Sequence, residues 1–369
     1  MERADRNITP LDELYLQRAY ELAARGIGGT APNPPAGAVV VRDGRIVGEG
    51  YHHRAGLPHA EPLALREAGA DARGATVYVS LEPCGHVGRT PPCTHALIEA
   101  GVVRVVAGTL DPAGHGGAGE LRDRGISVAI AGDPVAADLI EIFARTMTSN
   151  RPYVALKMAM SLDGAVASRP GVNERLGSDE EQRYVRALRV AYDAVMVGAG
   201  TVRIDDPQLT VRPPHDRLRQ YVRIVACETG ALSAGSRIFS EEPGYARTIV
   251  IAPAALQDRV RELQEVADVL CVGAPHATAL DLAEATKALR ARGIYSVLCE
   301  GGPRLAAGLI AARQVDRFYW AIAPVFLGNE NAVPVLRGVD LAALNARMSF
   351  DRVEMAGGDV IISGLCLAG

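Results

Sequence analysis

Short apolar runs alternate with amphipathic stretches along nearly the whole chain, and this alternation limits the possible folds more than any other feature. Residues 76–81, 154–160 and 296–299 have the length and apolar character of buried strands, whereas residues 60–68 and 179–191 are predicted to be helices. Strands that alternate with helices predict a largely parallel sheet covered by helices. The sequence therefore predicts an α/β protein.

The chain has 369 residues, which at about 150 residues per domain suggests two domains. The first series of elements ends between Ile130 and Arg151, and a second series begins at residue 154. We therefore predict one domain over residues 1–148 and another over residues 149–369. The other predicted strands are 37–41, 46–50, 102–107, 194–198, 222–227, 248–252 and 269–272, and the other predicted helices are 14–25 and 94–100. The glycine-rich piece 114–119 is expected to be a flexible loop.

The composition is that of a globular protein, with 48% hydrophobic residues, 22% charged residues and a net charge of -4. This charge argues against a protein that coats nucleic acid, which needs a clustered positive surface. Residues 1–14 lack the pattern of a secretory signal, and no stretch approaches the 18 consecutive apolar residues of a membrane span. Six cysteines are too sparse for a disulfide scaffold. A cytoplasmic protein is therefore expected.

Three short segments of the first half, 58–61, 81–84 and 91–93, carry the residues of a zinc site. Catalytic zinc takes three protein ligands and keeps a fourth position open for water. The imidazole of His59 and the thiols of Cys84 and Cys93 form a soft donor set that suits zinc. Prolines precede both cysteines and favour helix starts, where the thiolate is stabilised.

Glu61 lies two residues after His59 and is the predicted proton carrier. A carboxylate beside zinc can take a proton from the metal's water and hand it to a leaving amine. His-x-Glu followed by Pro-Cys is typical of zinc-dependent deaminases, in which the next cysteine follows as Pro-Cys-x-x-Cys. Here eight residues separate Cys84 from Cys93, which departs from that short form.

A structural zinc site is the alternative, and it would need a fourth protein ligand. His86 or His95 could provide one. The occurrence of all three segments in order, on suitable elements, favours a catalytic zinc. The four cysteines of the second half are expected to be core residues, because three of them lie in apolar strand runs.

Two glycine-rich turns of the second half, 198–201 and 300–303, follow predicted strands. Glycine at a strand-to-helix turn lets backbone amides approach a phosphate. Neither turn has the full Gly-x-Gly-x-x-Gly pattern of dinucleotide binding. A tight turn without a ligand is therefore the alternative for each.

Taken together, the motifs resemble the RibD family of bifunctional riboflavin-biosynthesis proteins over residues 14–367. The first half matches in NPPAGAV at 33–39, HAE at 59–61 and LEPCGHVGRTPPC at 81–93, and the second half matches at 157–164, 193–201, 205–212 and 300–303. The resemblance implies a cytidine-deaminase-like three-layer α/β/α domain, followed by a dihydrofolate-reductase-like α/β domain. It also implies Zn²⁺ and NADPH as cofactors.

For the first domain, the resemblance implies hydrolytic deamination of 2,5-diamino-6-(5-phosphoribosylamino)pyrimidin-4(3H)-one, with Glu61 catalytic. The residues that would contact this substrate are Asn33, His52, His86 and Arg89. Arg89 suits the phosphate because a guanidinium is forked and permanently charged. A turn residue is the alternative for Asn33, and solvated surface is the alternative for His52 and Arg89. The family commonly continues its Asp-Pro with Asn-Pro, whereas Ala113 stands here, so the exact pyrimidine stays open.

For the second domain, the resemblance implies NADPH-dependent reduction of the ribosyl group of 5-amino-6-(5-phosphoribosylamino)uracil to a ribityl chain. The residues that would line the cofactor are Ala159, Arg175, Thr201, Asp205, Gly302, Pro303, Arg304 and Leu305. The residues that would hold the substrate are Arg189, Leu209, Arg212 and Glu300. Arg175 stands where the family usually has an aromatic residue, and an arginine there could attract a cofactor phosphate.

The leading interpretation is thus a bifunctional deaminase and reductase that acts on small pyrimidine phosphates. The alternative is a specialised relative that mainly deaminates a related pyrimidine in secondary metabolism, with an altered or inactive reductase half. Ala113 and Arg175 motivate that alternative. A nucleic-acid-editing deaminase would need a basic, aromatic-lined path for the strand, which the net charge of -4 and the 5% aromatic content do not favour. The family suggests a homo-oligomer, either a dimer or a tetramer, with no nucleic-acid or membrane partner.

Overall fold

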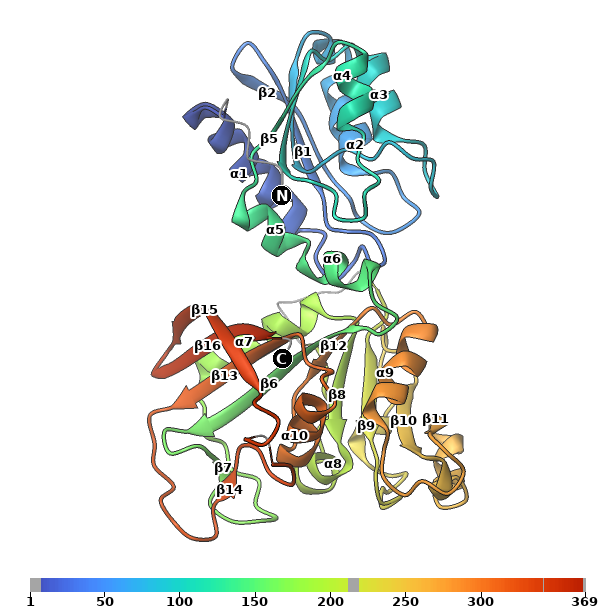
Figure 1. The fold of residues 1–369 in the computed structure, drawn as a ribbon, viewed down its shortest axis with the longest axis vertical. Helices are drawn as coiled ribbons and strands as arrows, with labels where there is room; N and C mark the ends of the chain where they lie inside the picture. Colours follow the sequence, from blue (N-terminus) through green and yellow to red (C-terminus); the bar gives the residue numbers. More distant parts are fainter. Residues whose placement is uncertain (1–7, 212–218, 341, 368–369) are drawn as a thin grey trace. The chain divides into compact units, whose positions relative to one another are not determined.

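The computed structural model describes residues 8–211, 219–340 and 342–367. The chain divides into two compact units, Met1–Ser149 and Asn150–Gly369, and each contains its own main sheet (Figure 1). Within the described ranges, no helix is long and apolar enough to cross a membrane.

The first unit has a five-stranded sheet of order β2-β1-β3-β4-β5. Its strands are β1 (Gly37–Arg42), β2 (Arg45–Tyr51), β3 (Thr76–Leu81), β4 (Arg104–Thr109) and β5 (Ser127–Ile130). Its helices are α1 (Pro10–Ala24), α2 (Ala60–Ala68), α3 (Cys93–Ala100), α4 (Ala118–Asp123), α5 (Pro134–Leu139) and α6 (Glu141–Met147), with a short 3₁₀ turn at Gly69–Ala72. The sheet is mixed, because β1 is antiparallel to both of its neighbours and β3, β4 and β5 are parallel.

Strand β1 shows why the apolar runs are continuous rather than alternating. Ala38 and Val40 enter a core that also contains residues of α2, α3 and α4, whereas Val39 and Val41 enter a second core with α1 and α5 on the other face. A strand with both faces covered gains from apolar residues at every position. The result is the three-layer α/β/α arrangement that the resemblance implies (Figure 1).

A close backbone approach and a set of backbone hydrogen bonds position the segments that carry the zinc ligands His59 and Cys84. A Cβ atom on Gly50 of β2 would lie 2.5 Å from the carbonyl oxygen of Ala60, so glycine lets the start of α2 lie against the sheet. The glycine-rich piece 114–119 is held in a similar way: the Gly85 amide donates to the His115 carbonyl at 2.9 Å, and the Gly117 amide donates to the Pro83 carbonyl at 2.8 Å. The prediction of a flexible loop is therefore wrong, because these backbone hydrogen bonds pair the loop with the Cys84 segment.

The second unit has a nine-stranded sheet of order β11-β10-β9-β8-β12-β6-β13-β16-β15 and a small β14-β7 pair. The strands of the sheet are β6 (Tyr153–Ser161), β8 (Ala194–Gly198), β9 (Val222–Ala226), β10 (Thr248–Pro253), β11 (Ala267–Val272), β12 (Ser296–Cys299), β13 (Arg317–Ala323), β15 (Arg347–Ala356) and β16 (Asp359–Leu367). The pair consists of β7 (Ala165–Ala167) and β14 (Val333–Pro334), and the helices are α7 (Asp179–Ala191), α8 (Ala199–Asp205), α9 (Leu282–Ala291) and α10 (Pro303–Ala311). Short 3₁₀ turns lie at Arg237–Phe239, Ala254–Leu256 and Arg261–Glu265.

The strands from β11 to β13 are all parallel, and β16 and β15 add an antiparallel edge. Because β8 and β12 are parallel neighbours, their carboxyl ends lie together, and the Gly198 amide donates to the Gly301 carbonyl at 3.1 Å. Ligands of open parallel sheets bind at such carboxyl ends. Cys299, the last residue of β12, and Cys227, the residue after β9, are buried as expected, whereas Cys271 and Cys366 are half-buried.

Candidate active sites

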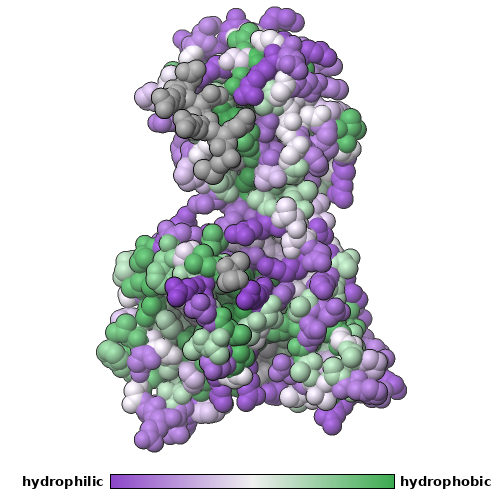
Figure 2. Space-filling model, in the orientation of Figure 1, coloured by the Kyte–Doolittle hydropathy of each residue, from purple (hydrophilic) through white to green (hydrophobic). Residues whose placement is uncertain are grey.

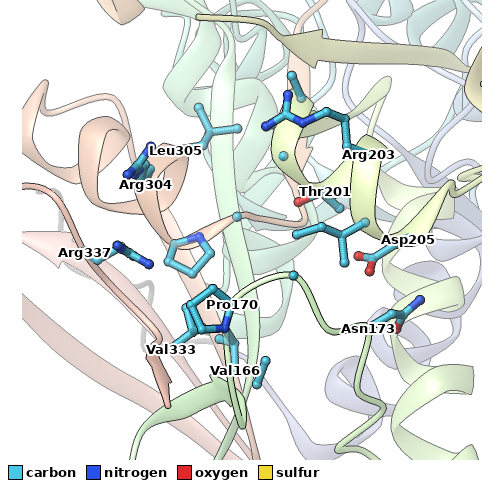
Figure 3. A pocket seen from close by; sticks show the side chains of 18 of the residues that line it. Val166, Pro170, Asn173, Thr201, Arg203, Asp205, Arg304, Leu305, Val333 and Arg337 are labelled. Atoms are coloured by element: carbon cyan, nitrogen blue, oxygen red, sulfur yellow. The ribbon is translucent and has the colours of Figure 1, made fainter. Parts of the chain in front are cut away.

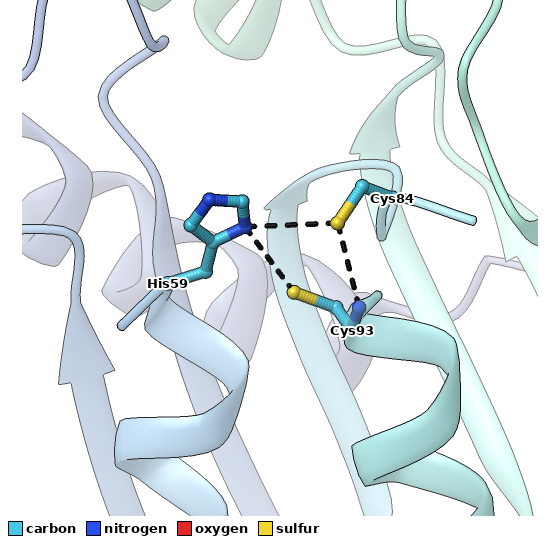
Figure 4. Close-up of side chains that lie close together, drawn as sticks. All are labelled: His59, Cys84 and Cys93. Atoms are coloured by element: carbon cyan, nitrogen blue, oxygen red, sulfur yellow. Dashed lines mark hydrogen bonds between the residues drawn. The ribbon is translucent and has the colours of Figure 1, made fainter. Parts of the chain in front are cut away.

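The three predicted zinc ligands come together in the first unit (Figure 4). His59 is the residue before α2, Cys93 is the first residue of α3, and Cys84 follows β3. The Nδ1 atom of His59 lies 3.6 Å from the Cys84 Sγ and 3.4 Å from the Cys93 Sγ. The three donor atoms all lie within 4.8 Å of one another, which is the spacing of ligands around one ion.

Only one of the two thiols ionises readily in the absence of a cation. Contacts with Cys93 and with His59 lower the pKa of the Cys84 thiol to about 4, and the neighbouring Cys84 in turn raises the pKa of Cys93. Two adjacent thiolates repel each other, and a bound cation offsets that repulsion. Thr90 Oγ1 lies 3.3 Å from the other ring nitrogen of His59, so the Nε2–H can donate to it while Nδ1 faces the sulfurs.

A fourth protein ligand is not found among the described residues. His95 instead faces Glu120 at 3.7 Å, and the His86 ring packs against the ring of His115 with centroids 4.4 Å apart. Glu61 is only 5% exposed and lines the same cavity as His59 and Cys84, and burial raises its pKa. An open fourth position beside a carboxylate is typical of catalytic rather than structural zinc.

A cavity of about 390 Å³ opens above this centre. It is lined by every residue predicted to contact the deaminase substrate, namely Asn33, His52, His86 and Arg89. The His52 Nδ1–H donates to the Pro58 carbonyl at 3.0 Å, which leaves Nε2 to accept from the Asn33 side-chain amide at 3.1 Å. His52 is buried, and burial lowers its pKa, so the ring is neutral and its tautomer is fixed.

A second cavity, of about 430 Å³, lies at the carboxyl ends of β6, β8 and β12 in the second unit. The predicted cofactor residues that line it are Ala159, Thr201, Asp205, Gly302, Pro303, Arg304 and Leu305. Figure 3 shows Thr201 and Asp205 on one side of this cavity and Arg304 and Arg337 on another. Gly301 and Gly302 have φ angles of 105° and 92°, which only glycine adopts readily.

The N-terminus of α10 opens into this second cavity. A Cβ atom on Gly302 would lie 3.3 Å from Thr201 Oγ1. Because glycine has no side chain, a ligand in the cavity can approach the backbone at this residue. The first amides of a helix have no partner within the helix and favour an anion. Burial raises the pKa of Asp205 across the cavity.

Three of the predicted reductase residues, Arg175, Leu209 and Arg189, do not line the second cavity. Arg175 is exposed and pairs with Asp179, and Leu209 is buried in the core beside β8 and β9. The Arg189 guanidinium binds Glu300, with Nη2 2.7 Å from Oε2, and donates from Nη1 to the Thr210 carbonyl at 3.0 Å. Glu300 itself lines the cavity. Arg212 lies outside the described residues.

Sequence reasoning missed several cavity residues. Lys157 lies on the wall of the second cavity, and its ammonium is 2.5 Å from the Glu181 carboxylate of α7. The sequence did contain a signal for this residue, because Lys157 is a charged residue within the apolar run of β6. Arg337 of the second cavity and His115 of the first lie in irregular segments, and no local pattern marks them.

Two protein families match this chain. The cytidine and deoxycytidylate deaminase zinc-binding region matches residues 9–109, and the RibD C-terminal domain matches residues 152–362. The first match covers the zinc ligands His59, Cys84 and Cys93, and the second covers the cavity at the carboxyl ends of β6, β8 and β12.

Whole-length relatives agree with both matches. The riboflavin biosynthesis protein RibD of Escherichia coli K12 is 40% identical, over 95% of this chain and 98% of that protein, and the RibD of Aquifex aeolicus is 38% identical, over 96% and 98%. The solved structure of a Thermotoga maritima diaminohydroxyphosphoribosylaminopyrimidine deaminase/5-amino-6-(5-phosphoribosylamino)uracil reductase is 34% identical, covers 97% of this chain and 99% of its own, and has a TM-score of 0.83. Acinetobacter baumannii RibD gives the same TM-score at 33% identity, over 97% of this chain and 99% of that one. The chain therefore belongs to the RibD family, the bifunctional deaminases and reductases of riboflavin biosynthesis, which use Zn²⁺ and NADPH.

Proposed function

We propose that this chain deaminates 2,5-diamino-6-(5-phosphoribosylamino)pyrimidin-4(3H)-one in its first cavity and then reduces the ribosyl group of the product in its second. The observation that carries the proposal is the convergence of His59, Cys84 and Cys93 beside Glu61 at one cavity, in a chain that also has the RibD reductase region. The deaminase is assigned to residues 1–148 and the reductase to residues 149–369.

In the deamination step, the residues of the chain bind the ring and move one proton. The chemistry that zinc supplies when bound is Lewis-acid activation of a water molecule for attack on the ring carbon that carries the amino group. Glu61 takes a proton from that water and delivers it to the amino group, which leaves as ammonia. A carbonyl replaces the amino group, so one water is consumed for each ammonia released.

Asn33 is the residue placed to orient the pyrimidine. Because His52 accepts one hydrogen of its side-chain amide, Asn33 keeps its carbonyl oxygen and a second N–H for the ring. His52 acts as a positioning residue, whose own orientation is fixed by the Pro58 carbonyl. Arg89 and His86 are exposed and line the same cavity, which suits contact with the ribosyl phosphate arm.

In the reduction step, bound NADPH would supply a hydride for C1 of the ribosyl group. The bond between C1 and the ring oxygen breaks and that oxygen takes up a proton from solvent, which leaves the open ribityl chain. The backbone amides of Gly302, Arg304 and Leu305 at the start of α10 would hold a cofactor phosphate, whereas Pro303 has no N–H to donate. Ala159, Thr201 and Asp205 line the same cavity. Glu300 contacts the substrate, and Arg189 positions Glu300 through their ion pair. Leu209 and Arg212 are assigned to substrate binding, and Arg175 to cofactor binding, from the family resemblance alone.

No observation favours the alternative of a deaminase with a silent reductase half. Arg175 is exposed and engaged with Asp179, so it leaves the second cavity open. The test is to incubate the purified protein with the aminopyrimidine ribosyl phosphate, with and without NADPH. Ammonia release followed by NADPH oxidation supports the proposal. Ammonia release without any NADPH oxidation would favour the specialised deaminase.

We also assign a homo-oligomer, a dimer or tetramer, in the cytoplasm and without nucleic acid as a partner. β15 is an edge strand, and its side chains Phe350, Val353 and Met355 are 69%, 64% and 67% exposed. Apolar residues gather over this end of the second sheet (Figure 2), and such edges favour association. The six free cysteines fit a reducing compartment. Light scattering tests the assembly, and a monomeric mass would overturn it.

A further inference from the structure

The loop between β4 and α4 is built as a rigid part of the deaminase cavity. Glu82 clamps it at both ends, since one carboxylate oxygen accepts from the Asp111 amide at 3.1 Å and the other accepts from the Ala118 amide at 3.0 Å. A Cβ atom on Gly116 would lie 2.0 Å from the Glu82 Cδ. The loop can therefore pass this close to Glu82 only because glycine stands at this position.

This clamped loop brings one histidine to the cavity. His115 lines the wall, its carbonyl accepts from the Gly85 amide, and its ring lies 4.4 Å from the ring of His86. Ala113, where the family commonly has an asparagine, offers no polar side chain to the same cavity. Asp111 does, but its carboxylate accepts from the Ala113 amide at 2.8 Å. His115 is thus the side chain of this loop that is placed to donate a hydrogen bond to a ligand.

The position of His115 along the depth of the cavity indicates what it binds. Glu61 is buried at the inner end, beside the zinc ligands, whereas His86, Arg89 and His115 are exposed at the outer end. A pyrimidine whose amino group reaches Glu61 must therefore extend its ribosyl phosphate toward these three residues. Within the described part of the chain, the side chains of Arg89 and His115 have neither an ion pair nor a hydrogen bond, so their N–H groups are available to an anion.

We propose that His115 is a specificity-determining residue of the deaminase and binds the substrate phosphate together with Arg89. This inference rests on the proposed deaminase function. A phosphate dianion accepts several charge-assisted hydrogen bonds, and an imidazole beside a guanidinium supplies them from two directions. The loop thereby selects the phosphate ester over the corresponding riboside, in a place where the asparagine of the family is missing.

The experiment compares the phosphate ester with its dephosphorylated riboside in the full-length zinc-loaded protein. His115→Ala is expected to raise KM for the ester about tenfold and to change kcat less than twofold, because the contact is remote from the reacting carbon. For the riboside, KM is expected to stay within twofold; if the riboside is not turned over, its competitive inhibition constant takes the place of KM. His115→Gln, which keeps an N–H donor, is expected to recover part of the affinity for the ester.

His95→Ala is the matched control, because His95 is an exposed histidine of the same unit that does not line the cavity. His95→Ala should leave KM and kcat for the ester and for the riboside unchanged. All variants should retain the zinc content of the wild type. Three results for His115→Ala would overturn the proposal. They are an equal loss of affinity for the ester and the riboside, an unchanged affinity for both, and a loss of zinc. If the wild type releases no ammonia from the ester, the proposed function itself fails, which is a different outcome from a wild-type-like His115→Ala.

Discussion

Replacing Glu61 with glutamine would remove the proposed acid–base group while changing the shape of the deaminase site very little. The two side chains are isosteric, and none of the three zinc ligands is altered. Glu61 lies in the first turn of α2, where a negative charge contributes about 0.3 to 1 kcal/mol, so the free energy of unfolding should fall by no more than about 1 kcal/mol. General acid–base catalysis typically contributes about 100- to 10,000-fold in rate. We therefore expect kcat for ammonia release to fall at least about 100-fold, which corresponds to roughly 3 kcal/mol in the barrier.

The assay measures ammonia release, zinc content and NADPH oxidation on the same preparations. Glu99→Gln is the matched control, because Glu99 is an exposed carboxylate of α3 outside the cavity. NADPH oxidation with the deaminated pyrimidine should be unchanged in Glu61→Gln, since the reductase cavity is in the other unit. A Glu61→Gln protein with full zinc content and more than about a tenth of the wild-type kcat would refute the assigned role.

Three other perturbations test separate parts of the molecule. Removal of zinc by a chelator should abolish ammonia release and leave NADPH oxidation on the deaminated pyrimidine intact; loss of both activities would contradict two independent sites. Gly302→Ala should weaken NADPH binding about tenfold in a fluorescence titration, because its Cβ would lie 3.3 Å from Thr201 Oγ1 at a φ of 92°; unchanged affinity would remove this turn from the cofactor site. Asp12→Asn should lower the free energy of unfolding by about 3 kcal/mol at pH 7, because Asp12 is 2% exposed and accepts from Arg104 Nη1 at 2.6 Å. Although burial acts to raise it, the pKa of Asp12 is held below its usual range by hydrogen bonds from Arg104, Thr9 and Tyr78, so its contribution should be present above about pH 4 and fall as the pH drops below that. Denaturant unfolding at pH 7 and pH 3 measures this, and an equal pH dependence in wild type and Asp12→Asn would contradict it.

Several parts of the structure follow from local signals. β3, β8, β12, α2 and α7 have the predicted bounds, because burial on both faces gives strands continuous apolar runs and amphipathic periodicity marks helices. The zinc ligands were also predictable, since each lies in a short motif at the end of an element: His59 precedes α2, Cys84 follows β3 and Cys93 begins α3. The antiparallel hairpin of β1 and β2 also follows from a local signal, the Asp43-Gly44 turn. The sheet of the first unit is less parallel than predicted because β1 is antiparallel to β3 as well, a pairing that no local pattern marks.

Contacts between distant segments could not be predicted in this way. Arg189 of α7 pairs with Glu300, which follows β12. This pairing depends on where the end of β12 lies relative to α7, and the sequence around Arg189 does not indicate that position. Arg175 was expected to face the cofactor, but the short spacing to Asp179 gives it a nearer partner on the surface.

The sequence by itself determined the alternation of strands with helices, the three zinc ligands, Glu61 and the family, because each of these depends on short local patterns in the chain. Only the tertiary structure decided that Asn33 is oriented by His52, that Glu82 clamps a glycine-rich loop, and that His115 reaches the deaminase cavity. These arrangements depend on hydrogen bonds and close approaches between segments that the fold brings together. The direction of a side chain across such a contact is set by packing, which no local sequence pattern contains.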